Sequence, residues 1–214
     1  MSQATGGFML KYIVFDFDGT LVNSRPLAIQ LFNDFADKYG YRKINDDEVE
    51  YLATLSIPDR LKTLGCPMYK LPLLVMDMKK KYKKDVSTLR SVPGIREVLG
   101  ELKKQGVMIG ILSSNYEVNI RSFLALNEID AFDFVFTARN LFGKDNGILR
   151  LMKEKGISRD EILYVGDELR DIEACNKIHI PCAAVTWGFE AEELLVSANP
   201  QYIIHEPGEI CNIL

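Results

Sequence analysis

Two carboxylates close together in this sequence could do acid–base or metal chemistry. They lie in the segment FDFDGT at residues 15–20, directly after a run of β-branched and aromatic residues. Because strand side chains alternate, Asp16 and Asp18 can face the same side, and Gly19 lets the chain turn sharply. Two acids this close resist joint ionisation unless a cation joins them, and hydrated Mg2+ prefers such oxygen ligands. The alternative is that Asp18 belongs to an ordinary turn and Asp16 is a surface acid.

Two further segments supply hydroxyl, amide and ammonium groups. The apolar run 109–112 ends in Ser113, Ser114 and Asn115. Hydroxyls at that point could hold phosphate oxygens, although a serine there is also a common helix cap or turn former. Lys144 opens a later helical pattern, where its ammonium could stabilise the charge of a transferring phosphoryl group. The alternative for Lys144 is an isolated surface lysine.

The fourth segment is YVGDELRD at residues 164–171, another apolar run that ends in glycine and acids. If a helix begins near Glu168, Asp167 and Asp171 lie on the same side and can serve one cation, directly or through water. Acids are also favoured at a helix N-terminus for electrostatic reasons alone. This segment therefore contains candidate metal ligands with a second possible role as helix-terminal acids.

The elements that must position these segments can be read from the hydrophobic pattern. Five short runs are typical of buried strands, at residues 11–15, 107–112, 132–136, 162–165 and 182–185. Patterns of helix length follow three of them, at residues 116–127, 145–155 and 169–177. This alternation predicts an α/β fold, a Rossmann-like three-layer core with a five-stranded parallel sheet between helices.

About ninety residues separate the first predicted strand from the second, far more than one crossover helix needs. Residues 22–91 have helical patterns almost throughout, at 26–39, 46–55, 58–64 and 71–84. We call residues 22–91 the helical insertion and predict that it forms a small α-helical cap domain. Residues 1–21 and 92–214 are then the α/β core domain. We interpret the lysine-rich run 79–84 as a solvated helix face, with an anion-binding patch as the alternative.

All four chemical segments fall at the C-terminal ends of predicted strands, which is where open α/β sheets bind ligands. Their joint occurrence in this order is far less probable by chance than any one of them. Together they supply a nucleophile, a proton carrier, donors for a phosphate group and a metal cluster.

The composition argues against several other classes of protein. Hydrophobic residues make up 47% of the chain and the formal net charge is -4, which indicates a globular protein without a bias toward nucleic acid. The four cysteines form no CxxC pair or Cys/His cluster, so we expect neither zinc nor a disulfide framework. The first ten residues lack the features of a signal peptide, and no segment approaches the roughly 20 apolar residues of a membrane span. We expect a cytoplasmic monomer or homodimer with no nucleic-acid or membrane partner.

The four segments resemble the motifs of the haloacid-dehalogenase-like hydrolases, which read DxDGT, a strand-ending Ser or Thr, a lysine, and GDxxxD. The resemblance spans residues 11–188. It implies that Asp16 is the nucleophile and forms an aspartyl-phosphate, and that Asp18 protonates the leaving alcohol and later activates water. It also implies that Mg2+ is held by the Asp16 carboxylate, the Asp18 backbone carbonyl and Asp167, with Asp171 close behind.

The same resemblance implies that Ser113 and Lys144 hold the phosphoryl oxygens. We expect the neighbouring residues of these loops to contact the substrate, namely Gly19, Thr20, Ser114 and Asn115. An insertion directly after the first motif looks like the helical cap of the phosphoglycolate phosphatase and β-phosphoglucomutase branch. Such caps close over the site and exclude water. In the insertion, Arg60 could bind a second anionic group of the substrate or form a salt bridge to a nearby acid of the insertion.

The predicted function is a Mg2+-dependent phosphatase that acts on a small phosphorylated metabolite, either phosphoglycolate-like or a sugar phosphate monoester. Asp18 favours a phosphate ester, since dehalogenases and phosphonate-cleaving relatives are expected to lack an acid at that position. Asp145 follows Lys144 where the phosphoglycolate phosphatase-like group often has proline, so specificity for phosphoglycolate itself is not predicted. The alternatives are a phosphomutase of the β-phosphoglucomutase type and a non-catalytic phosphate-binding regulator.

Overall fold

The computed structural model describes residues 10–138 and 143–214. The prediction that the first residues hold no signal segment therefore falls mostly outside the described residues. At the centre is a parallel sheet with the strand order β3-β2-β1-β4-β5-β6. Its strands are β1 (Tyr12–Phe15), β2 (Met108–Ser113), β3 (Phe134–Thr137), β4 (Ile162–Gly166), β5 (Cys182–Val185) and β6 (Tyr202–Ile204). The predicted class, an α/β fold around a parallel sheet, is confirmed.

The described residues form six strands and not the predicted five. The additional strand, β6, pairs with β5 at one edge of the sheet. A run of three residues is too short for its apolar pattern to stand out in the sequence. Its assignment depends on pairing with β5, which is a tertiary contact.

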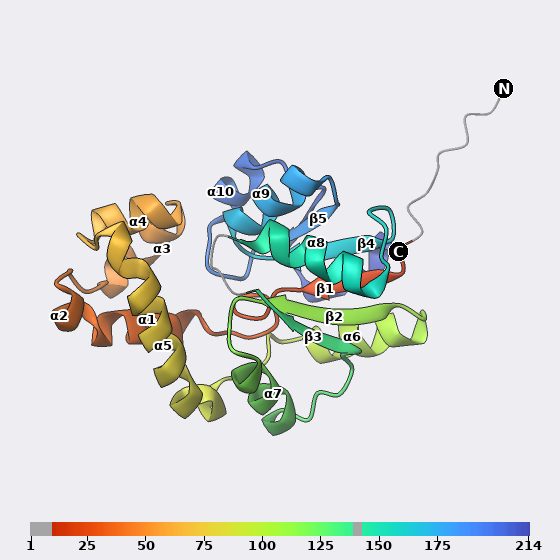
Figure 1. Ribbon diagram of the computed structural model, residues 1–214, viewed down its shortest axis with the longest axis horizontal. Coiled ribbons are helices and arrows are strands. Elements are labelled where there is room, and N and C mark those ends of the chain that lie inside the picture. The colour runs from red at the N-terminus through yellow and green to blue at the C-terminus, as the bar shows by residue number, and fades with distance from the viewer. Residues whose placement is uncertain (1–9, 139–142) are drawn as a thin grey trace.

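Helices cover both faces of the sheet (Figure 1). On one face lie α6 (Ile95–Lys104) and α7 (Glu117–Leu126), together with the 3-10 segment η4 (Pro207–Ile213). On the other face lie α8 (Lys144–Lys155), α9 (Leu169–Ile178) and α10 (Glu192–Ser197). Strand β1 shows how the sequence builds these layers, since Ile13 and Phe15 pack into the first cluster and Val14 into the second.

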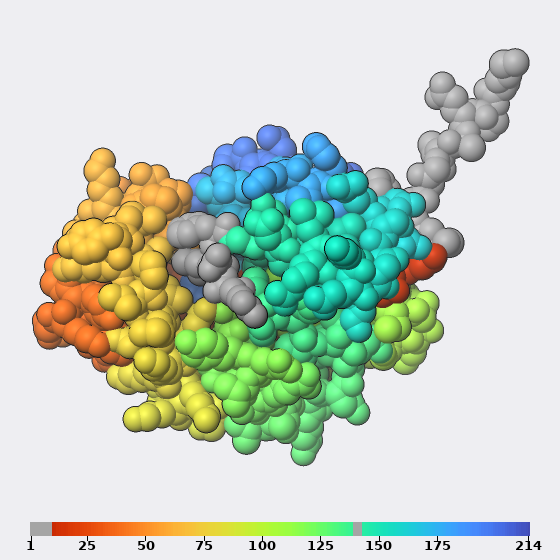
Figure 2. Space-filling model, viewed as in Figure 1, coloured from red at the N-terminus to blue at the C-terminus, as the bar shows by residue number. Residues whose placement is uncertain are grey.

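The helical insertion lies beyond the C-terminal ends of the strands, to one side of the sheet (Figures 1 and 2). Its helices are α1 (Arg25–Asp34), α2 (Ala36–Tyr39), α3 (Val49–Ala53), α4 (Ile57–Thr63) and α5 (Leu71–Asp85). Three 3-10 turns accompany them, η1 (Asp46–Glu48), η2 (Met68–Lys70) and η3 (Val86–Thr88). These helices share a hydrophobic cluster of their own that includes Phe32, Leu61 and Leu74. This separate cluster supports the predicted division into domains, which stays a prediction.

Two predicted helices of the insertion differ from those observed. The helix expected at 26–39 is interrupted at Phe35, whose N–H bonds to the Phe32 carbonyl in a turn tighter than an α-helix. The helix expected at 46–55 begins as the 3-10 turn η1 and continues as α3. Within the described part of the chain, none of the helices combines the length and apolar character needed to cross a membrane.

Candidate active site

Asp16 directly follows β1, which lies between β2 and β4 near the middle of the sheet. Its backbone N–H donates to the Val165 carbonyl at 2.8 Å, so the residue continues the ladder with β4. The residue is 2% exposed, and its carboxylate accepts hydrogen bonds from Phe17 N at 2.7 Å and from Lys144 Nζ at 2.6 Å. The alternative of a surface acid is therefore excluded for Asp16.

Lys144 is the first residue of α8, and its side chain is only 2% exposed. Its ammonium group bridges Asp16 and Asp171. Burial by itself would lower the pKa of Lys144, but the two carboxylates raise it above its ordinary value. The lysine is thus a buried cation next to the candidate nucleophile, and the alternative of a surface lysine is excluded.

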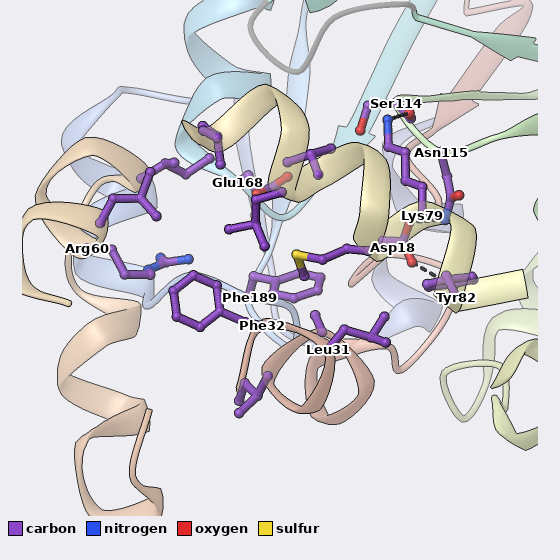
Figure 3. A pocket seen from close by; sticks show the side chains of 18 of the residues that line it. Asp18, Leu31, Phe32, Arg60, Lys79, Tyr82, Ser114, Asn115, Glu168 and Phe189 are labelled. Carbon is purple, nitrogen blue, oxygen red and sulfur yellow. Dashed lines mark hydrogen bonds between the residues drawn. The ribbon is translucent and has the colours of Figure 1, made fainter. Parts of the chain in front are cut away.

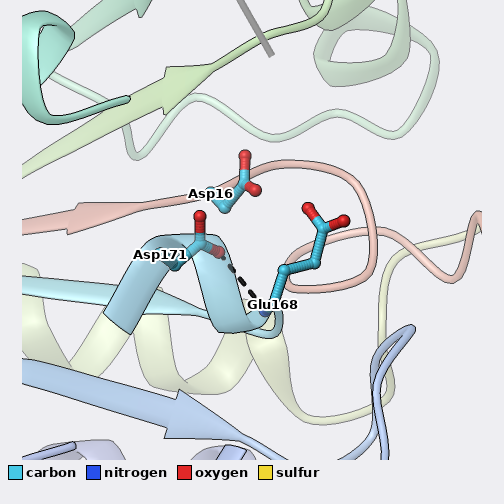
Figure 4. Close-up of side chains that lie close together, drawn as sticks. All are labelled: Asp16, Glu168 and Asp171. Carbon is cyan, nitrogen blue, oxygen red and sulfur yellow. Dashed lines mark hydrogen bonds between the residues drawn. The ribbon is translucent and has the colours of Figure 1, made fainter. Parts of the chain in front are cut away.

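Three buried acids, two of which bind this lysine, lie close together (Figure 4). Carboxylate oxygens of Asp16, Glu168 and Asp171 come within 4.8 Å of one another. Burial, together with the nearby Asp16, raises the pKa of Asp171 to about 6, although Lys144 opposes the shift. Asp171 also accepts a hydrogen bond from Glu168 N at 3.4 Å at the start of α9, so the helix-terminal role expected as an alternative is present as well.

Asp167 is fully buried next to this cluster, and Gly19 and Thr20 hold it in place. Its carboxylate accepts hydrogen bonds from Thr20 Oγ1 at 2.7 Å and from Phe189 N at 2.8 Å. Gly19 has φ +80°, and a Cβ atom there would lie 2.1 Å from Asp167 Oδ2. Glycine is therefore required for this close approach. Gly19 and Thr20 contact Asp167, and their predicted contact with substrate stays a prediction.

The donor set of this region fits a hard divalent cation. Glu168 is neutralised by Arg170, whose Nε donates to Glu168 Oε2 at 2.8 Å. Burial and repulsion from the neighbouring acids raise the pKa of Asp167 well above its ordinary value. Of the other buried carboxylates here, Asp16 and Asp171 share the ammonium of Lys144, and Asp167 accepts only the neutral donors described above. A cation with oxygen ligands would relieve this excess of negative charge.

The Asp18 carboxylate accepts hydrogen bonds from two side chains (Figure 3). Tyr82 Oη donates to its Oδ1 and Asn115 Nδ2 donates to its Oδ2, each at 2.8 Å. Burial raises the pKa of the Asp18 carboxyl, and these two hydrogen bonds oppose the rise. Ser113 is buried, and its Oγ accepts from Asn115 N at 3.1 Å, which is the local turn expected as one alternative. Tyr116 is the N-cap of α7, so the helix-cap alternative for Ser113 is excluded.

A cavity of about 260 Å³ lies between the helical insertion and the core (Figure 3). Four of the predicted site residues line it, namely Asp18, Arg60, Ser114 and Asn115. The structure thus divides the predicted residues into two adjoining groups. Asp16, Lys144 and Asp171 form a buried charged group at the strand ends, and the lining residues face the cavity.

Arg60 lines this cavity, but its guanidinium is already bound. Nε donates to the Leu52 carbonyl at 2.9 Å and Nη2 to the Leu55 carbonyl at 3.0 Å. Nη2 also lies 3.4 Å from Oε1 of Glu190, which is buried. The alternative of a salt bridge is thus observed, with one correction. The acid belongs to the segment after β5 and not to the insertion, because chain folding brings that segment against α4.

The interpretation of residues 79–84 as a solvated helix face is wrong at two positions. Lys79 donates a hydrogen bond to the Ser114 carbonyl. Tyr82 is 6% exposed and donates a hydrogen bond to Asp18. Both residues continue a stripe of helical spacing that runs from Val75 to Val86. That spacing was available in the sequence and could have separated these two residues from the exposed lysines.

Comparisons with known proteins agree with this geometry. Residues 13–185 match the family model of the haloacid dehalogenase-like hydrolases. The chain is 30% identical over 202 residues to a phosphoglycolate phosphatase from Synechococcus elongatus, covering 94% of this chain and 95% of the relative. It is 24% identical over 215 residues to the pyrophosphatase PpaX from Bacillus velezensis, with 94% of each chain covered.

Among solved structures, a haloacid dehalogenase-like family hydrolase from Streptococcus pneumoniae has a TM-score of 0.79 at 21% identity. The match covers 95% of this chain and 98% of that chain, and at this identity it supports the fold alone. The family resemblance predicted from the four motifs is confirmed.

Proposed function

Because the chain belongs to the haloacid dehalogenase-like hydrolase family, we propose that it is a Mg2+-dependent phosphatase of small phosphorylated metabolites. One observation carries this proposal. Asp16 lies at the C-terminal edge of the sheet, where it belongs to a buried acidic cluster and pairs with a buried ammonium. A carboxylate in that setting can attack phosphorus while the neighbouring cation neutralises the charge of the phosphoryl group.

In the proposed reaction, an Asp16 carboxylate oxygen forms a bond to phosphorus as the ester bond to the alcohol breaks. Asp18 gives its proton to the leaving alcohol oxygen, and its raised pKa suits a group that must start protonated. The Asp18 carboxylate then takes a proton from water, and the resulting hydroxide attacks the phosphorus of the aspartyl-phosphate. Free phosphate leaves, and Asp16 and Asp18 return to their starting forms.

The metal would be held by the predicted carboxylates of Asp16, Asp167 and Asp171 and by the Asp18 backbone carbonyl. Glu168 adds a further carboxylate within reach of the same position. When bound, Mg2+ supplies positive charge that stabilises the phosphoryl oxygens during transfer. The surplus of buried negative charge in this region supports the assignment.

The remaining predicted residues would bind the phosphate and shield the reaction. Ser113 accepts one hydrogen bond through its Oγ and retains its own hydroxyl proton for a phosphoryl oxygen. Ser114 and Asn115 line the cavity on the same side. We assign the helical insertion the role of a cap that excludes water from the site.

Phosphate release from para-nitrophenyl phosphate and a panel of phosphorylated metabolites tests the proposal. We expect release with Mg2+, none with EDTA, and none from Asp16→Asn. The exposed Asp160→Asn serves as the matched control, because Asp160 lies on the surface away from the site. Formation of a sugar phosphate isomer with little free phosphate would instead indicate a mutase. Phosphate binding without turnover would indicate a regulator.

A further inference from the structure

The cavity beside the candidate active site begins at the residue proposed to protonate the leaving alcohol. Asp18 and Asn115 line one end of the cavity, and the rest extends beneath the helical insertion (Figure 3). An ester that places its bridging oxygen at Asp18 therefore directs the alcohol part of the molecule into this cavity. The chemistry of the cavity walls then determines which alcohols fit.

Most of the wall away from Asp18 is apolar. Residues from α1, α4, α5 and the segment after β5 form it, including Leu31, Phe32, Leu61, Leu74, Met78 and Phe189. A polar or charged alcohol in this space would lose water without gaining hydrogen bonds from these side chains. An apolar body would instead remove both its own surface and that of the wall from water.

The cations that line the cavity are already engaged. Arg60 donates to two backbone carbonyls and lies beside Glu190. Lys79 donates to the Ser114 carbonyl, and burial lowers its pKa. A second anionic group that drew Arg60 away from its partners would leave two backbone carbonyls and the buried Glu190 unpaired.

The third cation of the lining, Arg170, is hydrogen-bonded to Glu168 at 2.8 Å. Its guanidinium is thus part of the charge balance of the acidic cluster. Among the described residues that line the cavity, the two arginines are paired with acids, whereas Lys79 donates to a neutral carbonyl at the Asp18 end. Away from that end the cavity therefore offers shape and apolar surface, and the positive charges of its arginines are already balanced by carboxylates.

Given the proposed phosphatase function, on which this step rests, we infer that the enzyme prefers phosphate monoesters of alcohols with an apolar body. An apolar cavity of about 150 Å³ is enough to take a benzene ring, and this one measures about 260 Å³. It therefore accepts an aromatic ring or an alkyl chain of several carbons. The relatives named for phosphoglycolate and pyrophosphate act on molecules with a second anionic group, which this cavity disfavours.

A series of n-alkyl phosphates from methyl to octyl phosphate, compared with 2-phosphoglycolate and phenyl phosphate, tests the inference. We expect kcat/KM to rise about fourfold for each methylene that enters the cavity, until the cavity is full. Phenyl phosphate should exceed 2-phosphoglycolate. The same assays with and without Mg2+ report the proposed function independently.

Two residues of α5 provide a matched pair of variants. Met78 lines the cavity, whereas Met76 lies on the same helix with 37% exposure and outside the lining. We expect Met78→Gln to lower the ratio of kcat/KM between hexyl and methyl phosphate by about fourfold or more. Met76→Gln should leave that ratio unchanged. Val75→Thr, a change that nearly keeps the volume of a second lining residue, should also lower the ratio, and thermal unfolding should confirm that each variant is folded.

Two results overturn the inference while the proposed function stands. One is Asp16-dependent phosphate release that does not rise with chain length, and the other is a highest kcat/KM with 2-phosphoglycolate. If no ester is hydrolysed, the proposed function is wrong, and ligand binding then tests the preference of the cavity for an apolar body. Calorimetry with hexylphosphonate and phosphonoacetate should then show tighter binding of hexylphosphonate, and equal or reversed affinities would overturn it.

Discussion

Replacing Lys144 with methionine removes one charge from the buried cluster while keeping a side chain of similar length. The lysine side chain is 2% exposed and is paired with Asp16 and Asp171. Removing one partner of a buried ion pair costs about 3–5 kcal/mol, because the other charge stays buried without compensation. For a chain of this size, about 1 kcal/mol changes Tm by roughly 2–4 °C. We therefore expect Lys144→Met to lower Tm by about 6–20 °C at pH 8.

The size of this loss depends on pH. Burial raises the pKa of Asp171 to about 6, whereas its ordinary value is 3.8. A carboxyl with a raised folded pKa binds its proton more tightly in the folded state. Its contribution to stability is present at low pH and is lost as pH rises through about 6. Lys144 opposes the rise in this pKa. Removing Lys144 therefore lowers the free energy of unfolding most at pH values where Asp171 is ionised. The loss should be smaller at pH 5 than at pH 8.

Urea and thermal unfolding followed by circular dichroism, in metal-free buffer at pH 5 and pH 8, measure this effect. Lys104→Met is the matched control, since Lys104 pairs with Glu101 at 3.3 Å and both side chains are exposed, by 77% and 47%. Exposed pairs contribute about 0–1 kcal/mol, so the control should lose little at either pH. Equal losses in the two variants, or a loss at pH 5 as large as at pH 8, would refute the reasoning about buried charge.

Two further predictions concern the residues around the acids. Gly19→Ala should lower the free energy of unfolding more than Gly65→Ala in urea denaturation. Both glycines have positive φ, but a Cβ at Gly19 meets Asp167 Oδ2 at 2.1 Å and one at Gly65 meets no atom within 4 Å. Similar losses would contradict the steric argument. Tyr82→Phe removes a hydrogen bond that lowers the pKa of Asp18. The alkaline limb of the kcat/KM profile should therefore move to higher pH, and an unmoved limb would count against Asp18 as the proton donor.

The strand-end site could be predicted from sequence because parallel strands bring their C-terminal ends to one edge of a sheet. Asp16 and Lys144 lie far apart in the chain, yet their Oδ2 and Nζ atoms come within 2.6 Å. Asp16 comes directly after the apolar run of β1, and Lys144 begins the helical pattern of α8. The predicted α/β class depended on that same alternation of buried runs and helical patterns.

The remaining features depend on contacts that no local pattern encodes. The pairing of Arg60 with Glu190 requires the segment after β5 to fold against α4. The three-residue β6 exists through pairing with its neighbour. Lys79 is a different case, since its helical spacing indicated a buried face but the surrounding lysines favoured a solvated one. For the burial of Lys79, the 3.6-residue period of the helix is therefore a better predictor than the charge of the short lysine-rich run.

One helix connects the cavity to the chemistry. On α5, Val75 and Met78 line the cavity, and Tyr82, about one turn further along, donates to Asp18. The same helix is tied to the core where Asn119 Nδ2 donates to the Lys79 carbonyl at 3.2 Å. Because a helix moves as a rigid unit, a ligand that packs against its cavity face also favours the position in which Tyr82 reaches Asp18. An apolar alcohol group should therefore raise kcat and lower KM. Binding energy that is equal in the ground state and the transition state would lower KM alone.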